Sequence, residues 1–565
     1  MEIKKIQTDV LVIGGGGAGV RAALKSNEEG KEVLILSKGT ISKCGLTPMA
    51  YPSIQASFGY EDARDNPDVH YQDIVEGGRG LSDENLARVL ADESPIRVRE
   101  LVEMGIKFEE KDGRLLQVHH PGQKYPRNMV IQTGGYGLIS GLRREMKKIP
   151  EILVMEDCMV TKLFVADGQV HGVFAYDMRS GSYLVVEAKA VILATGGYEA
   201  FWGKTDAAPD STGDGLALAY HAGVQIIDLE MILYYPTVVV SEAGRGILVQ
   251  YETLLRDEYV GGQMLNAKGE NLIPSGKPPT RDVLMNIMID QVEKENGGPN
   301  DGMYIDLTKS PKSKEYIEEL MSKLFSIPGK NLALQGVDFS QGVVEVAPGV
   351  HFTLGGVRID ENCRTNIEGL FAAGEVSSNL HGANRISGNA LAETQVFGYR
   401  AGLFAAQYVD GMDMATTIQD KDIQQEISRL ELFSGKPDPD SPRPVMLKKL
   451  LNKIMDDLVG TRRSYESLSE AKREIIRLAK RTQEIRTGNL QMAYNHEFCE
   501  ALELANMAEM SRWVAESALL RMETRGHHIR TDYPETDPKW SRHTATQYAK
   551  PLGTLEVTRL QNKES

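Results

Sequence analysis

Three glycines near the start of the chain have a spacing that suits the phosphates of a dinucleotide. Gly14, Gly16 and Gly19 form the pattern Gly-x-Gly-x-x-Gly directly after the apolar segment 10–13. The first glycine of such a pattern allows a tight turn, the second admits the pyrophosphate, and the third lets a helix pack against a strand. A helical pattern over 20–27 and an apolar segment over 33–36 follow. This context indicates a phosphate-binding βαβ unit, which the three glycines alone would not.

Two later strand ends also carry glycines. Residues 191–197 and 369–375 each combine an apolar strand with a glycine turn. The second strand of the βαβ unit ends in Ser37-Lys38, where a nicotinamide site usually has an acid for the ribose hydroxyls. Three glycine-marked strand ends along one chain predict a long cofactor held from several sides, which fits FAD better than NAD.

The elements that must position these turns follow an α/β pattern. After the βαβ unit, strands are predicted over 152–155, 161–165, 171–176, 183–187 and 190–194. Residues 236–345 mix short strands, turns and two helical stretches, which indicates an inserted domain. The run 434–444 has the composition of a linker. Three helices are predicted in the C-terminal part. The first spans 447–460, the second begins at a capping box of Ser467 with Glu470, and the third spans 496–522.

Composition excludes several function classes. The 64 Lys and Arg against 79 Asp and Glu give a formal net charge of −15, which argues against a general nucleic-acid binder. The four cysteines form no Cys-x-x-Cys pair, so neither a disulfide scaffold nor an internal iron–sulfur module is expected. No apolar run reaches about 18 residues and no signal-like segment opens the chain, so we expect a cytoplasmic protein without a membrane span.

Eight motifs between residues 12 and 534 carry a likeness that runs from about residue 8 to about residue 545, nearly the whole chain. They are VIGGGGAG (12–19), LSKG (36–39), ATGG (194–197), STGDG (211–215), HFTLGG (351–356), AAGE (372–375), LHGANRISGNAL (380–391) and ETRGHHIRTDYP (523–534). In this order they resemble the flavoprotein subunit of succinate dehydrogenase and fumarate reductase, with L-aspartate oxidase as a relative.

The resemblance implies an α/β fold with a Rossmann-like FAD-binding domain, an inserted α+β capping domain and a C-terminal helical domain. We expect the FAD-binding domain to be split over 1–235 and 346–415. The capping domain would span 236–345, the helical domain 416–530 and a polar C-terminal tail 531–565. The substrate would lie between the flavin and the cap.

The resemblance also implies FAD contacts at matching positions. They are Gly14, Gly16, Gly17, Ala18, Gly19, Ser37, Lys38, Gly39, Ala194, Thr195, Gly196, Asp214, Glu375, Asn389, Ala390 and Leu391. Glu375 would accept hydrogen bonds from ribitol or ribose hydroxyls. Some family members attach FAD covalently through a histidine, but Leu46 stands at the matching place. Leucine cannot form that bond, so non-covalent FAD is predicted.

The family reaction is hydride transfer between flavin N5 and a dicarboxylate, which would interconvert fumarate and succinate or a related carboxylate. His351 and Arg385 match the residues that hold a substrate carboxylate, and an arginine fork can bind one with two hydrogen bonds. Thr353 would add a hydroxyl donor to the substrate site.

Segment 246–258 resembles, with small insertions, the family segment that contains the proton donor, so the resemblance implies a donor here. Arg256 is the predicted donor, with Glu252 and Glu258 as relay partners, and Arg245 is the rival. An arginine holds its proton at ordinary pH, so it can act only within a relay that reprotonates it at once.

One position departs from the family pattern. Tyr235 stands where the family has a histidine that helps to bind the second carboxylate, and tyrosine cannot carry positive charge. Two alternatives therefore stay open. The same flavin chemistry could act on another substrate, such as an amino acid or another enoate, or the chain could be an FAD-containing electron-transfer subunit without dicarboxylate turnover. Because the chain has no cluster ligands of its own, an iron–sulfur partner subunit is expected.

Overall fold

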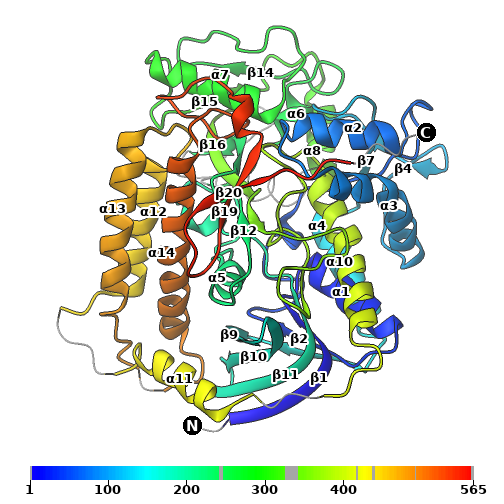
Figure 1. Cartoon of the computed structure of the whole chain (residues 1–565). Helices are drawn as coiled ribbons and strands as arrows, with labels where there is room; N and C mark the ends of the chain where they lie inside the picture. The colour runs from blue at the N-terminus through cyan, green and yellow to red at the C-terminus, as the bar shows by residue number, and fades with distance from the viewer. Residues whose placement is uncertain are drawn as a thin grey trace.

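The predicted βαβ unit lies within a mixed sheet of seven described strands in the lower part of the molecule (Figure 1). The computed structural model describes residues 3–240, 246–324, 342–414, 418–435, 440–489 and 491–560, with side chains up to residue 320 in the second range. The strand order is β8-β2-β1-β11-β10-β9, and β18 also pairs with β11. These elements are β1 (Ile3–Ile13), α1 (Gly17–Glu28), β2 (Val33–Ser37), β8 (Ile152–Glu156), β9 (Cys158–Ala166), β10 (Gln169–Asp177), β11 (Ser182–Leu193) and β18 (Leu370–Ala372).

β11 is one long strand where the sequence predicted two. It pairs with β1 in parallel from Ile3 opposite Tyr183 to Ile13 opposite Leu193. Lys189, in the predicted break, lies within this strand, and its ammonium lies 2.7 Å from a carboxylate oxygen of Asp9. The other three predicted strands are present and extend by one or more residues at their ends.

Helices cover the sheet and approach each other closely. α1 packs against α10 (Asn389–Tyr408), beside α2 (Pro67–Gly77), α3 (Glu84–Glu103) and α4 (Gly134–Met146). A Cβ atom added at Gly402 of α10 would lie 2.3 Å from the carbonyl oxygen of Ala22 in α1. The two helices therefore touch at backbone distance, which holds the glycine loop before α1 against the start of α10.

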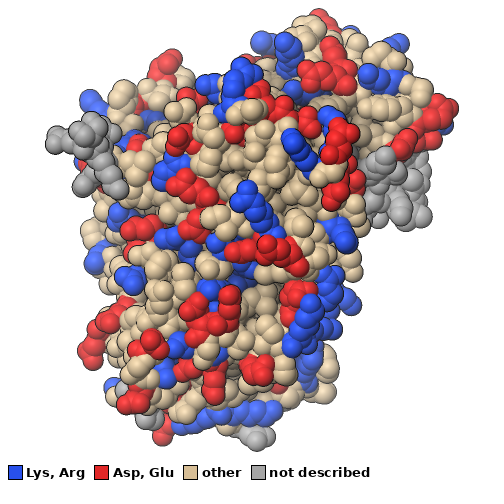
Figure 2. Space-filling model, turned by 90° about the vertical axis from the view of Figure 1, so that its right-hand side faces the viewer, with Lys and Arg blue, Asp and Glu red and all other residues tan. Residues whose placement is uncertain are grey.

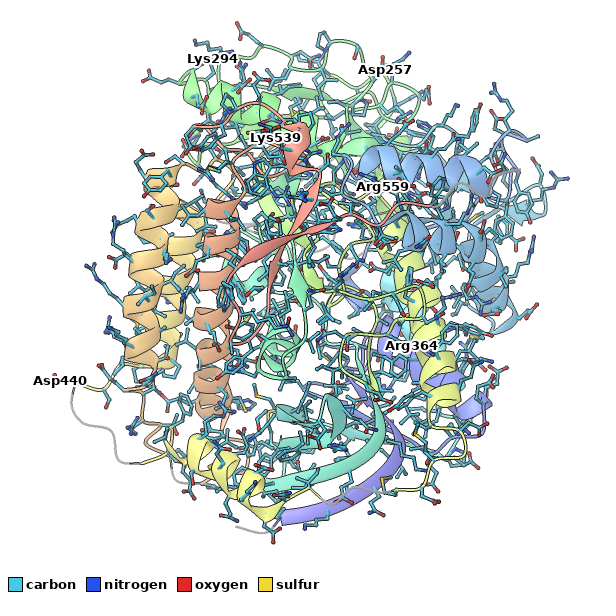
Figure 3. All side chains as sticks on the ribbon, in the orientation of Figure 1. Asp257, Lys294, Arg364, Asp440, Lys539 and Arg559 are labelled. Atoms are coloured by element: carbon cyan, nitrogen blue, oxygen red, sulfur yellow. The ribbon has the colours of Figure 1, made fainter. Side chains whose placement is uncertain are left out.

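A second sheet forms the inserted unit at the top of the molecule (Figure 1). Its strand order is β13-β16-β15-β14, and it has an apolar core of its own that includes Val239, Leu254 and Met303. Asp257 and Lys294 mark its outer edge (Figure 3). The elements are β13 (Ile232–Val239), α6 (Tyr251–Leu254), β14 (Gln263–Leu265), α7 (Arg281–Glu293), β15 (Met303–Asp306), α8 (Lys314–Leu324) and β16 (Val343–Thr353). The expected boundaries at 235 and 346 lie within β13 and β16, so these two strands connect the inserted unit to the rest.

Three C-terminal helices stand side by side along one flank, and a fourth lies at the lower end of that flank (Figure 1). The three are α12 (Pro444–Leu458), α13 (Tyr465–Thr482) and α14 (His496–Leu520), and the fourth is α11 (Asp420–Glu431). The predicted capping box is wrong by one turn. Ser464 is the N-cap of α13, because its extended backbone lets its side chain accept from the amide of Ser467, while the Ser467 hydroxyl accepts from the amide of Ser464. Residues 436–439 of the expected linker lie outside the described residues.

The segment expected to be a polar tail is folded against the body through residue 560. It contains η4 (Pro538–Trp540), β19 (Arg542–Thr546) and β20 (Gly553–Glu556), and β19 pairs with β12 (Ile226–Ile227). Near its end, Arg559 forms an ion pair of 3.0 Å with Glu84 at the start of α3 (Figure 3).

The surface carries charge of both signs. On the face shown in Figure 2, basic and acidic side chains are interspersed over the molecule. No helix within the described ranges combines the length and the apolar character needed to cross a bilayer. An anionic ligand must therefore be attracted by a local arrangement of positive groups, since the overall charge is negative.

Candidate active site

A long cavity of about 460 Å³ runs from the glycine loop before α1 to the inserted unit, and its volume is typical of ligand sites. Gly14 has a φ of +114°, and a Cβ atom there would lie 2.1 Å from the carbonyl oxygen of Ala194. Only glycine allows the loop to turn this close to β11. The loop leads directly into α1, whose free amides favour a phosphate.

The start of α10 lines the same cavity. Gly388, Ala390 and Leu391 are wall residues, so the N-termini of two helices reach this space. The hydroxyl of Thr195, another wall residue, is buried with no hydrogen-bond partner among the described residues. A long cavity with helix N-termini and an unsatisfied hydroxyl fits a dinucleotide such as FAD.

All but two of the predicted FAD contacts line this cavity. Gly19 lies behind it, where a Cβ atom would come within 2.0 Å of the Gly14 carbonyl oxygen, so this glycine serves packing. Asn389 is fully buried, and its amide oxygen lies 3.0 Å from Nε2 of His70. Leu46, at the position of the covalent histidine, lines the cavity, and non-covalent attachment stays a prediction.

Lys38 and Asp214 line the cavity but are paired with each other. Lys38 Nζ lies 2.7 Å from an oxygen of Asp214 and 2.7 Å from an oxygen of Glu503 in α14. Burial alone would lower the pKa of Lys38, but these two carboxylates raise it. The positive charge is thus neutralised within the protein and ties the cavity wall to the C-terminal helices.

Glu375 lies beside a second buried carboxyl group, that of Glu199. Oε1 of Glu375 accepts from the backbone amide of Thr353 at 2.9 Å. Burial and the neighbouring Glu199 hold the pKa of Glu375 well above its usual range, which favours the protonated carboxyl group. In that form Glu375 can donate a hydrogen bond into the cavity, besides accepting one as predicted.

His351 lines the other end of the cavity, beneath the inserted unit. Its Nδ1 lies 2.8 Å from Oδ2 of Asp206, and its ring centroid lies 5.1 Å from that of Tyr235. Burial lowers the pKa of His351, and the Asp206 carboxylate only partly opposes this. In the neutral ring, Asp206 fixes the proton on Nδ1 and leaves Nε2 as the second polar atom.

Arg385 lines the cavity without a carboxylate partner. Its side chain is buried, its Nε has no hydrogen-bond partner and it forms no ion pair within the described part of the chain. The guanidinium lies 4.5 Å above the ring centroid of Phe352. Burial and the nearby Arg281 lower the pKa of Arg385 to about 9. An anion bound here would stabilise the charged guanidinium.

Arg281 is a wall residue that the sequence did not predict. It is the first residue of α7, and its Nη2 lies 3.2 Å from Oε1 of Glu252. Burial would lower the pKa of Arg281, but Glu252 raises it above the ordinary value. Its Nη1 is buried with no partner among the described residues, although it belongs to a residue of the cavity wall. The likeness of segment 246–258 to the family's donor segment favoured Arg256, and no motif around Arg281 indicated a role for that residue.

The remaining predicted site residues lie behind the wall. Tyr235 is buried and its hydroxyl donates to Glu252, and Arg281 lies 4.7 Å above its ring centroid. Thr353 is fully buried behind Glu375. Arg256 does not line the cavity, and its nearest ion-pair partner in the described chain is Glu258 at 3.9 Å. Arg245 lies outside the described residues.

Comparison with known proteins gives two family matches that together cover most of the chain. Residues 9–391 match a family model described as FAD binding domain, and residues 448–564 match one described as fumarate reductase flavoprotein C-term.

Curated relatives match along their whole length. One subunit of the fumarate reductase (CoM/CoB) of Methanothermobacter marburgensis is 37% identical over 96% of this chain and 97% of that protein. The fumarate reductase flavoprotein subunit of Haemophilus influenzae is 30% identical over 97% and 93%. Among solved structures, the FrdA chain of E. coli quinol fumarate reductase superposes with a TM-score of 0.90 at 26% identity, over 100% of this chain and 98% of that one.

Proposed function

The chain belongs to the family of fumarate reductase and succinate dehydrogenase flavoproteins, and from that premise we propose that this FAD-dependent oxidoreductase interconverts fumarate and succinate. The observation that carries the choice of substrate is the pair of buried guanidinium groups at one end of the cavity. Arg281 has a carboxylate partner in Glu252, whereas Arg385 has no ion pair in the described chain. A substrate carboxylate would supply the missing negative charge.

The two units of the molecule contribute different groups to this end of the cavity. Arg385 comes from the unit that holds the glycine loop, and Arg281 comes from α7 of the inserted unit. A substrate bound between them would be held from both sides, and water would be excluded from the reacting carbons. The predicted position of the substrate, between flavin and cap, agrees with this arrangement.

In the proposed mechanism, FAD supplies the hydride for one alkene carbon of fumarate when it is bound in the long cavity. Arg385 holds one substrate carboxylate with two hydrogen bonds, and His351 donates to the other once it is protonated. The guanidinium of Arg281 donates a proton to the second alkene carbon, and Glu252 returns a proton to Arg281. Hydride and proton together convert fumarate to succinate, and the reverse order oxidises succinate.

We assign the proton donor to Arg281, in place of the predicted Arg256. Arg281 lines the cavity and is hydrogen-bonded to Glu252, which meets the requirement for a relay that reprotonates an arginine at once. Glu252 keeps its predicted place as relay partner. Burial alone would raise the pKa of Glu252, but Arg281 and His120 place it below the ordinary value. Tyr235 and Thr353 then support the site from behind.

A second candidate substrate is a monocarboxylate enoate, and Tyr235 is the observation that favours it. The hydroxyl of Tyr235 donates to Glu252, so this residue brings no positive charge to a second carboxylate. If His351 does not become charged in the complex, Arg385 alone would select for a single carboxylate.

Two expectations about assembly and location belong to the proposal. We expect an iron–sulfur partner subunit to exchange electrons with the flavin, because relatives of similar length are named as subunits of fumarate reductases. We also expect the protein to act in the cytoplasm.

The test is oxidation of dithionite-reduced methyl viologen by fumarate or crotonate, catalysed by the FAD-loaded protein. We expect fumarate to be reduced faster than crotonate. Arg385→Gln should lower kcat/KM by about 30-fold or more, since unpairing a buried charge costs roughly 2–5 kcal/mol. Arg364→Gln is the matched control, because Arg364, labelled in Figure 3, is exposed and lines neither cavity. Reduction of crotonate but not fumarate would favour the second candidate, and reduction of neither would refute both.

A further inference from the structure

A smaller cavity of about 120 Å³ lies behind the substrate end of the long one. The two cavities share three wall residues, Arg281, Arg385 and Ser387. Glu252, which accepts from Arg281, lines only the smaller cavity. The smaller cavity therefore touches both members of the proposed proton relay from the side away from the glycine loop.

The opposite wall of this cavity reaches the surface. Glu76 in the last turn of α2, Arg79 and Gly122 are wall residues, and all three are exposed. The cavity thus extends from exposed side chains to Glu252, which is 1% exposed, and to Arg281, which is 8% exposed. Its size and its polar walls, which include Thr280 and Ser387, meet the requirements for holding water.

The relay needs such a connection to solvent. Every turnover moves one proton to or from Arg281, and Glu252 is too deeply buried to exchange protons with bulk water directly. Arg256 offers no link in the described chain, because its nearest ion-pair partner is Glu258 and its Nε is buried without a hydrogen-bond partner. The cavity is the described feature that joins Glu252 to the surface.

We propose that this smaller cavity is the passage through which protons travel between solvent and Glu252, with Glu76 at its mouth. The inference rests on the proposed function, since it names the proton path of that same site. In fumarate reduction a proton passes from solvent along water in the cavity to Glu252, then to Arg281 and to the substrate carbon; succinate oxidation reverses the path.

An ion pair fixes the shape of the mouth. Arg79 Nη2 lies 2.7 Å from Oδ2 of Asp282, the residue after Arg281 in α7. The backbone carbonyl of Arg79 in turn accepts from Nη1 of Arg525 at 2.6 Å. The ion pair connects the segment after α2 to the start of α7, and the hydrogen bond from Arg525 connects it to the segment after α14. The opening is therefore fixed relative to the relay arginine.

Position 76 allows the passage to be narrowed with little risk to folding, because the side chain is exposed on a helix. Glu76→Trp should obstruct the mouth, and Glu76→Gln should keep its size while removing the carboxylate. Gln72→Trp is the control, since Gln72 is exposed one turn earlier on α2 and does not line the cavity. The measurements are kcat, KM and the solvent deuterium isotope effect for fumarate reduction, with FAD content determined for each holoenzyme.

For Glu76→Trp we expect kcat to fall by about tenfold, within the roughly 10²–10⁴-fold that proton transfer contributes in total, and the isotope effect to rise. KM and FAD content should match the unmodified protein, as should all values for Gln72→Trp. A fall for Glu76→Gln as well would show that the carboxylate carries the proton. The inference is overturned if Glu76→Trp leaves kcat and the isotope effect unchanged, or raises KM alone. Failure of the proposed function would give a different result, because the unmodified protein itself would then not reduce fumarate.

Discussion

Arg281 and Arg256 of the inserted unit are the two candidates for the proton donor to the substrate. Arg281 lines the long cavity and is hydrogen-bonded to Glu252, whereas Arg256 lines neither cavity. We expect Arg281→Gln to lower kcat for fumarate reduction by roughly 10²–10⁴-fold, the usual contribution of a positioned proton donor. Arg256→Gln should cause a loss at least about tenfold smaller. FAD content, read from flavin absorbance, should be unchanged in both, and a larger loss for Arg256→Gln would return the role to that residue.

His351 and Asp206 make substrate binding depend on pH. Burial keeps the pKa of His351 below its ordinary value, so the free ring is neutral at pH 7, and a substrate carboxylate favours the charged ring. Binding then takes up a proton, and KM should rise as pH increases. Asp206→Asn removes the carboxylate that opposes the effect of burial, so the rise should begin at a lower pH. At a pH above the pKa of His351 in the free site, each unit by which that pKa is lowered raises KM about tenfold.

The measurement is KM for fumarate between pH 6 and 9 for the unmodified protein and for Asp206→Asn. Asp62→Asn serves as control, because Asp62 pairs with Arg64, two positions later in the chain, and lies outside the cavity wall. A KM that does not change with pH in the unmodified protein would contradict a neutral His351 in the free site.

The sequence could identify some site residues because their motifs are local. His351 and Arg385 lie in HFTLGG and LHGANRISGNAL, and both line the cavity. The sequence did not predict a role for Arg281, because that role depends on a contact across the fold. Glu252 lies 29 positions earlier in the chain, and the two residues meet only when α6 and α7 come together. Asp206 is similarly brought to His351 from 145 positions away.

At the scale of elements, the contact between α1 and α10 holds the cofactor loop. A Cβ atom at Gly402 would lie 2.3 Å from the carbonyl oxygen of Ala22, so even the smallest side chain must separate the helices. We expect Gly402→Ala to destabilise the protein by about 1–3 kcal/mol, as overpacking usually does. Thermal unfolding of the FAD-loaded protein measures this. Gly553→Ala is the control, because nothing lies within 4 Å of a Cβ there, and an equal effect of both would contradict the contact.

The sequence predicted the type of most elements better than their ends. Apolar runs located the strands of the large sheet, but β11 continues through the charged Lys189, where the sequence predicted a break, and the Lys189 ammonium pairs with Asp9. The start of α13 was misplaced because Ser464 and Ser467 both suit a cap, and the choice depends on which residue has an extended backbone. Such choices are decided by the packing of the whole helix, which local patterns do not encode.

At the scale of the whole molecule, the C-terminal segment connects the C-terminal helices to the part of the molecule that holds the large sheet. Its composition, polar with prolines, predicted a tail, since β19 and β20 are short and lack a long apolar run. Their position is specified by polar contacts with distant residues. The carboxylates of Asp228 and Glu230 accept from the amide and the hydroxyl of Thr544 in β19 at 3.1 and 2.8 Å.

Arg521, at the end of α14, is the centre of this junction. It is fully buried and forms ion pairs with Asp228, Glu230 and Glu523, and it donates to the carbonyl oxygens of Trp540 and Arg542. We expect Arg521→Met to cost about 3–5 kcal/mol of folding free energy, because it leaves buried carboxylates without their partner while keeping the volume of the side chain. Thermal unfolding should show the loss, and limited proteolysis should cleave the segment after residue 530 sooner.

The control for this junction lies on the same helix. Arg512 forms an exposed pair of 2.7 Å with Glu516, and such surface pairs contribute about 0–1 kcal/mol. Arg512→Met should therefore leave both the unfolding temperature and the rate of proteolysis nearly unchanged. If Arg521→Met behaved in the same way, the C-terminal segment would have to be held by its strand pairing alone. In that case Thr544→Val, which removes the hydroxyl bonded to Glu230 but leaves the β19 backbone pairing intact, would also have no effect.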